Sequence, residues 1–276
     1  MNERYLEEGE FVTILGCEWQ HSGYGDKVVH YLGGDQPFLA ADDRKSDSVE
    51  KLYEAVKASD AFIVSHHTAY KQKLWCGGTD YDVINTDIER LIELWSMHGS
   101  SEGFDDASLL MRDMDNENTI MDALRKGLKL GFAAGSDTHS GRPGGSAKEP
   151  RPYWGGLTAV WAKEKTRRSI FEALFNRHTY ALTGSRIVLK MTVNGALMGS
   201  EIKNTDKADV TIKVWAPKLI EKIQVIKNTK KLTEIDPGAK SAEFDFSDNS
   251  MPGDFYHCRI ILIDGSIAVC SPIWIV

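Results

Sequence analysis

Short apolar runs that end in histidine, glutamate or aspartate constrain the fold of this chain more than any other feature of its sequence. Runs of this kind, bounded by Gly, Asp or His, are typical of strands buried on both faces, as in a parallel sheet. They occupy residues 11–19, 61–67, 90–99, 131–139 and 156–162. The sequence therefore predicts five buried strands.

Helical patterns separate several of these runs. Apolar residues recur on one helical face in residues 46–59, 118–130 and 166–178. Strands that alternate with helices indicate right-handed βαβ units with parallel strands. We therefore expect residues 1–186 to form an α/β domain.

The pattern changes after residue 186. From there on, strand-like segments are separated by Asn-Gly, Asp-Gly and Pro-Gly turns, and helical periodicity is absent from the sequence. Such a pattern is typical of antiparallel sheets. We expect residues 187–276 to form a small antiparallel β-sandwich-like domain.

Four of the five predicted strands end in residue types that bind metal ions. The carboxyl ends of parallel strands meet at one edge of a sheet, so side chains there converge on a common crevice. Imidazole and carboxylate groups together suit zinc, manganese or iron. The candidate ligands are Glu18, His66, His98, Asp137 and His139.

Two alternatives stay open at this site. His66 and His67 fall on opposite faces of the predicted strand, so we expect one of them to be a ligand and favour His66. Residues 99–103, Gly-Ser-Ser-Glu-Gly, fit the G-x-S-x-G motif of serine hydrolases, with Ser101 as the nucleophile. We weigh this second alternative less, because no helical pattern follows the motif directly.

The composition narrows the range of partners. The net charge is −7, whereas nucleic acids and anionic membranes attract basic surfaces, so we expect neither as a partner. The sequence has no apolar run of about 20 residues that could span a membrane, and residues 1–10 lack the apolar core of a signal peptide. We expect a soluble protein, cytoplasmic or periplasmic, that could form a homo-oligomer.

Several stretches resemble the polymerase and histidinol phosphatase (PHP) family of metal-dependent hydrolases, and more closely a PHP-related branch of unknown function. They include GCEW (16–19), IVSHHTAY (63–70), IELWSMHGSSE (92–102) and AAGSDTHSGRPG (133–144). The resemblance implies a distorted seven-stranded, TIM-like (β/α) barrel with two or three divalent ions (Zn²⁺, Mn²⁺ or Fe²⁺). It also implies hydrolysis of a small phosphorylated substrate by a metal-activated water.

The resemblance also implies roles for individual residues. Glu18 is similar to the family's bridging carboxylate, His66 and His98 to its mid-chain histidines, and Asp137 and His139 to its final Asp-x-His pair. Asp137 could in addition accept a proton. Arg142, in the loop that follows, is a candidate phosphate clamp, because a guanidinium group matches phosphate oxygens.

The sequence departs from the family in one respect. The family begins with a His-x-His strand and a second strand that ends in histidine, and this sequence contains no His-x-His. We therefore expect a partial barrel that lacks two strand–helix units, and weak or no phosphoester hydrolysis by a chain of this length. The alternative is a non-catalytic protein that binds metal or a partner.

Overall fold

The structure is mostly β-sheet. A computed structural model describes residues 3–71, 77–104, 118–139, 156–203 and 205–276. Strands make up 41% of it and helices 11%, and the described residues form three sheets and three α-helices. The expected α/β fold, a partial (β/α) barrel, is therefore wrong.

The first sheet has six strands and mixes parallel with antiparallel pairs. β2 is antiparallel to both of its neighbours, β1 and β3. β4 is parallel to β3 and to β6, and antiparallel to the short β5. The strands are β1 (Leu15–Trp19), β2 (Lys27–Tyr31), β3 (Ala61–Ser65), β4 (Glu89–Ser96), β5 (Gly99–Ser100) and β6 (Gly131–Ala134).

β2 explains why the prediction of a parallel sheet failed. An apolar run indicates that a strand is buried but not in which direction it runs, so the pattern does not exclude an antiparallel neighbour. The sequence of β2, Lys-Val-Val-His-Tyr, carries three ionisable groups and does not stand out as an apolar run. β3 and β4 are parallel, and between them the described residues contain no helix.

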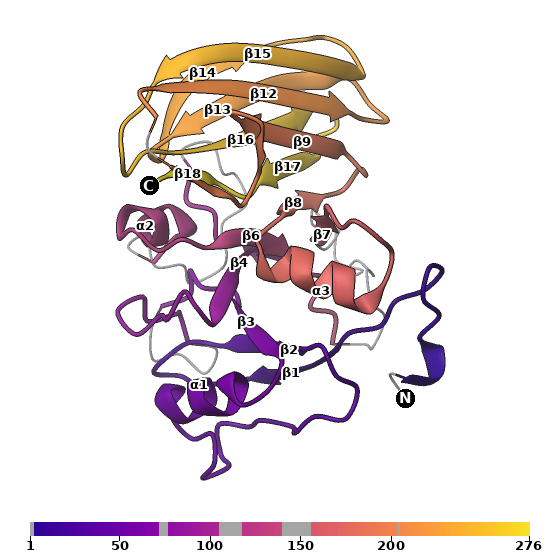
Figure 1. Cartoon of the computed structure of the whole chain (residues 1–276), viewed down its shortest axis with the longest axis vertical. Helices are drawn as coiled ribbons and strands as arrows, with labels where there is room; N and C mark the ends of the chain where they lie inside the picture. Colours follow the sequence, from indigo (N-terminus) through magenta and orange to yellow (C-terminus); the bar gives the residue numbers. More distant parts are fainter. Residues whose placement is uncertain (1–2, 72–76, 105–117, 140–155, 204) are drawn as a thin grey trace.

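The helices cover different parts of the first sheet (Figure 1). α1 (Val49–Lys57) buries Leu52 and Val56 in the core that also contains Trp19. α3 (Arg167–Phe175) packs on the opposite face, where the Phe171 ring meets Phe62 edge-on at 5.0 Å. α2 (Ile120–Arg125) packs between the first sheet and the third. A short 3-10 helix spans Glu3–Tyr5.

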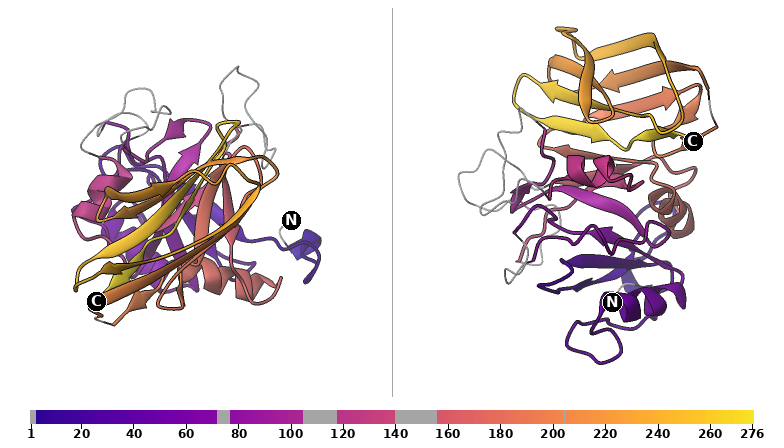
Figure 2. Two further views of the ribbon diagram at one scale, coloured as in Figure 1. Left: turned by 90° about the horizontal axis from the view of Figure 1, so that it is seen from above. Right: turned by 90° about the vertical axis from the view of Figure 1, so that its left-hand side faces the viewer.

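The second and third sheets pack face to face as a sandwich at the end of the molecule opposite α1 (Figures 1 and 2). The second sheet has four antiparallel strands, β9 (Val188–Val193), β10 (Ala196–Leu197), β12 (Lys207–Trp215) and β15 (Ser241–Asn249). The third has eight strands, β7 (Leu157–Val160), β8 (Thr179–Thr183), β11 (Glu201–Ile202), β13 (Ile220–Lys227), β14 (Lys230–Ile235), β16 (Phe255–Leu262), β17 (Ile267–Cys270) and β18 (Ile273–Ile275).

The third sheet crosses the boundary that the sequence places at residue 186. β8 pairs with β17, and β7 pairs with β8, so two strands of the first predicted domain belong to the sheet of the second. One apolar core also joins Phe132 of the first sheet to Val269 of the third. The limits of the sheets therefore differ from the predicted limits of the domains.

Within the described ranges, no helix combines the length and the apolar character needed to cross a lipid bilayer.

Candidate metal centre

Four strands that run in the same direction end at one edge of the first sheet. β1, β3, β4 and β6 share this direction, because β2 is antiparallel to both strands beside it. The side chains near these ends form two groups, in each of which one potential ligand atom per residue lies within 4.8 Å of the others. The groups are Glu18, His66 and His67, and His98, Asp137 and His139. The structure thus brings the five predicted ligands to one edge, together with His67, the alternative to His66.

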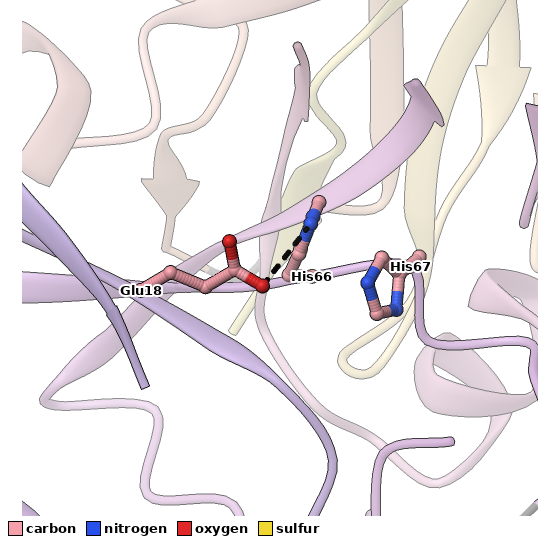
Figure 3. A group of neighbouring side chains, drawn as sticks. All are labelled: Glu18, His66 and His67. Atoms are coloured by element: carbon pink, nitrogen blue, oxygen red, sulfur yellow. Dashed lines mark ion pairs between the residues drawn. The ribbon is translucent and has the colours of Figure 1, made fainter. Parts of the chain in front are cut away.

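The first group comes from β1 and from the residues just after β3. Figure 3 shows the Glu18 carboxylate directed at His66, with Oε1 at 3.9 Å from the His66 Nε2 atom. The rings of His66 and His67 lie 3.8 Å apart, centroid to centroid. Both histidines are buried, whereas 36% of the Glu18 side chain is exposed. Solvent and ligands therefore have access to this group at Glu18.

The backbone at His67 explains why both histidines belong to the group. β3 ends at Ser65, and His67 has a positive φ of 26°. Regular alternation of side chains stops there. The expectation that His66 and His67 point to opposite sides of the strand therefore does not apply. A positive φ is uncommon outside glycine, and such strain is concentrated at functional sites.

The second group lies beyond the ends of β4 and β6. The rings of His98 and His139 meet edge-on with centroids 5.9 Å apart. His139 is exposed, and its Nδ1 atom lies 3.4 Å from the Met97 sulfur. Asp137 again has a positive φ, 50°, which places its carboxylate between the two groups.

Asp137 connects the two groups. Its Oδ2 atom lies 2.9 Å from Nε2 of His98 and 3.5 Å from Nε2 of His66. Burial would raise the pKa of Asp137, but the neighbouring His66 and His98 outweigh burial and hold that pKa well below its usual range. Asp137 is therefore ionised, and its negative charge serves both groups.

Glu93 and Tyr70 orient two of the histidines, and the sequence analysis missed both residues. Oε2 of Glu93 lies 2.9 Å from Nδ1 of His66, and the Tyr70 hydroxyl lies 2.9 Å from Nδ1 of His98. In each case the other ring nitrogen, Nε2, is left facing Asp137. Glu93 could have been found as a carboxylate inside the apolar run 90–99, where an unpaired charge is costly.

Asp26 is a further residue that the sequence analysis missed. It directly precedes β2, so the antiparallel direction of that strand brings it to the same edge of the sheet. Its Oδ1 accepts a hydrogen bond from the His21 N–H, and its Oδ2 lies 3.5 Å from Nε2 of His67. Burial raises the pKa of Asp26 to about 6. Without a prediction of β2, no sequence signal linked Asp26 to the site.

The residues at this edge fit a divalent metal ion. Among the described residues, four buried polar atoms here lack a hydrogen-bond partner of good geometry, namely Asp26 Oδ2, His67 Nδ1, Glu93 Oε1 and Asp137 Oδ2. Such atoms are rare in folded proteins and indicate a missing partner. Burial, together with the nearby His66 and His98, lowers the pKa of His67 to about 3, and neutral imidazole is the form that binds metals. Nitrogen and carboxylate ligands suit zinc, manganese or iron(II).

The structure does not favour Ser101 as a nucleophile, and it does not describe Arg142. Ser101 is fully buried, and its hydroxyl accepts a hydrogen bond from the Ala69 N–H at 3.4 Å. A serine nucleophile must be exposed to its substrate, so this environment does not favour the serine-hydrolase alternative. Arg142, the candidate phosphate clamp, lies outside the described residues.

Comparisons with other proteins find relatives without an assigned function. Residues 147–217 match DUF3604, a protein family of unknown function. The chain is 29% identical over 300 residues to an uncharacterised protein from Chlamydia pneumoniae, in a match that covers 98% of this chain and 47% of the relative. An uncharacterised protein from Chlamydia muridarum is 27% identical over 299 residues, with 98% and 48% covered. The chain spans about half the length of these curated relatives.

These matches overturn the resemblance to the PHP family. The family that matches is one of unknown function, and no PHP family matches the chain. No solved structure matches it either. The expected seven-stranded barrel and its two absent units rested on that resemblance and fall with it. The candidate ligands rest on their geometry alone.

Proposed function

We propose that this chain is a metal-dependent hydrolase that cleaves phosphoesters. The position of Asp137 Oδ2, within 3.5 Å of both His66 and His98, carries the proposal, because it joins two ligand groups into one centre. Paired ion positions are typical of enzymes that displace a group at phosphorus. The exposed side of Glu18 gives a substrate access to the centre.

A bound divalent ion supplies an activated water and a positive charge that neutralises phosphoryl oxygens. The side chains of the centre hold and orient what binds there. His66 and His98 present Nε2 because Glu93 and Tyr70 hold their Nδ1 atoms. Asp137, with its low pKa, is a strong ligand and a weak base, so we assign it first the role of a ligand.

Metal content and activity together test this proposal. Protein purified without chelator is analysed for zinc, manganese and iron, and is then assayed on aryl phosphates with each ion added. We expect bound metal, and turnover that Asp137→Ala abolishes. The matched control is Asp42→Ala, which removes an exposed carboxylate that belongs to neither ligand group.

Each result decides between the candidate functions. Metal that binds without any turnover would favour the alternative, a non-catalytic metal-binding protein. Protein that contains no metal as purified and binds none when ions are added would contradict both candidate functions. Turnover that persists in Asp137→Ala would place the chemistry elsewhere.

A further inference from the structure

A cavity of about 510 Å³ opens directly beside the candidate metal centre. Glu18, His66, Glu93 and Asp137 line it at the edge of the sheet, so a group bound at the centre has direct access to the cavity. Its volume lies within the range of about 300–1,000 Å³ that is usual for small-molecule sites. The rest of its lining therefore decides which substituent a substrate can carry.

One wall of the cavity is a face of the first sheet. Along β3, Phe62 and Val64 line it ahead of His66, and on β2 His30 lies opposite Phe62. Strands rise about 3.3 Å per residue, so Phe62 lies about 13 Å from His66 along the strand. Polar ligands therefore lie at one end of the cavity, and aromatic and aliphatic side chains line the remainder.

The facing wall is also apolar. Val160 of β7 and Leu174 of α3 line it, together with Ile14. The Thr158 hydroxyl of this wall donates to the Ala134 carbonyl and accepts from the Ala134 N–H, so its hydrogen bonds are already used. A hydroxyl-rich substituent would find few partners here, whereas a ring would find apolar contacts on both sides.

His30 lines the cavity at the end away from His66. Its ring stacks on Phe62 with centroids 5.2 Å apart, and among the described residues its buried Nδ1 atom has no hydrogen-bond partner. Burial lowers the pKa of His30 to about 4, so the ring is neutral near pH 7. A neutral imidazole can make one hydrogen bond to a hydroxyl group of a ligand.

We propose that the substrate is a phosphoester of an aromatic or similarly apolar alcohol, whose ring occupies this cavity with its far end at His30. The inference rests on the proposed phosphoesterase function and deepens it. Hydrolysis adds water across the P–O bond and releases the ring as its free alcohol together with inorganic phosphate. The apolar walls bind the ring, and the centre holds the phosphoryl group.

The first experiment compares two phosphomonoesters on the metal-loaded chain, naphthyl phosphate and glycerol phosphate. We expect Val64→Thr, which adds a hydroxyl group to the wall at nearly constant volume, to lower kcat/KM for naphthyl phosphate about 10-fold through KM. Turnover of glycerol phosphate should stay unchanged. Val188→Thr, on the exposed side of the second sheet, is the matched control.

A binding measurement separates this inference from the proposed function. Naphthol is titrated by fluorescence into metal-free protein, where no hydrolysis is possible, and Val64→Thr should weaken its binding. Dihydroxynaphthalene should bind more tightly than naphthol to the wild type, and His30→Phe should remove that advantage.

The outcomes are distinct. Equal turnover of both esters, with the same effect of Val64→Thr on each, would overturn the inference and leave the phosphoesterase proposal standing. Absence of naphthol binding would overturn it as well. Naphthol binding that depends on Val64, without hydrolysis of either ester, would support the cavity as a ring site and contradict the proposed function.

Discussion

The Oε2 atom of Glu93 lies 2.9 Å from Nδ1 of His66, and both side chains are buried. Burial would lower the pKa of His66, but the charges of Glu93 and Asp137 and their hydrogen bonds outweigh it and raise that pKa well above its ordinary value. The pair fixes the ring so that Nε2 faces Glu18 and Asp137. A carboxylate that holds the far nitrogen of a ligating histidine is a recurrent support of metal sites.

The first prediction concerns the contact between Glu93 and His66. Glu93→Gln keeps a hydrogen-bond acceptor near His66 but removes the charge, so we expect the affinity for zinc or manganese to fall about 10–100-fold. Isothermal titration of chelator-treated protein measures the change. Glu172→Gln, on the exposed side of α3, is the control and should leave the affinity unchanged. An unchanged affinity in Glu93→Gln would mean that His66 is not a ligand.

The second prediction compares two residues of the second group. Asp137 reaches both ligand groups, whereas His139 belongs to one and is exposed. Asp137→Ala should therefore reduce the number of ions bound per chain more than His139→Ala does. Elemental analysis after gel filtration measures both variants. Equal losses would indicate a single ion position rather than two joined by Asp137.

The ends of the predicted strands indicated where the site lies but not every residue that belongs to it. Glu18, His66 and His98 could be selected because apolar runs located β1, β3 and β4, and these strands end at one edge. The three strands end at one edge although the sheet is mixed, because β2 runs in the opposite direction between β1 and β3. Whether the selected residues hold a metal stays a prediction.

The remaining features of the site depend on details that periodicity does not encode. Alternation along the strand predicted that one of His66 and His67 is a ligand, and it could not show the positive φ at His67 with which both join the group. Asp26 needed β2 and its direction, and both follow from pairing across the sheet rather than from a local pattern. The mixed sheet was missed for the same reason, since burial of a strand is local information and its direction is not.

The third prediction uses the pKa of Asp26, which burial raises from 3.8 to about 6. Between these values the folded chain holds a proton that the unfolded chain has lost, so the free energy of unfolding falls as the pH rises from about 4 to about 6. At about 1.4 kcal/mol per pKa unit, the loss amounts to about 3 kcal/mol. Asp26→Asn should therefore stabilise metal-free protein near neutral pH, and less so near pH 4.

Urea unfolding of both proteins in chelator across this pH range tests the prediction. Asn keeps the Oδ1 acceptor for the His21 N–H, so the variant isolates the charge. With metal present the same substitution should weaken ion binding, because a nearby negative charge is lost. A gain in stability that does not change with pH would show that the effect is not electrostatic.

The fourth prediction concerns His257 of β16, which belongs to neither ligand group. The residue is fully buried, its ring meets Phe132 edge-on at 5.5 Å, and among the described residues neither ring nitrogen has a hydrogen-bond partner. Burial, with a smaller contribution from Arg259, lowers the pKa of His257 to about 3. The folded chain therefore keeps this ring neutral under acid conditions in which the unfolded chain protonates it.

This difference makes the wild type sensitive to acid. Below about pH 6.5 the unfolded state binds one proton more, so His257 lowers the free energy of unfolding by about 1.4 kcal/mol for each further pH unit. His257→Leu removes that dependence, and the stability of the variant relative to the wild type should rise steadily as the pH falls from about 6.5 to about 4. Urea unfolding of both proteins in chelator at several pH values measures the difference. If the free energies of unfolding of the wild type and of His257→Leu change in parallel over this pH range, the His257 ring is protonated in the folded protein and has a partner for its charge.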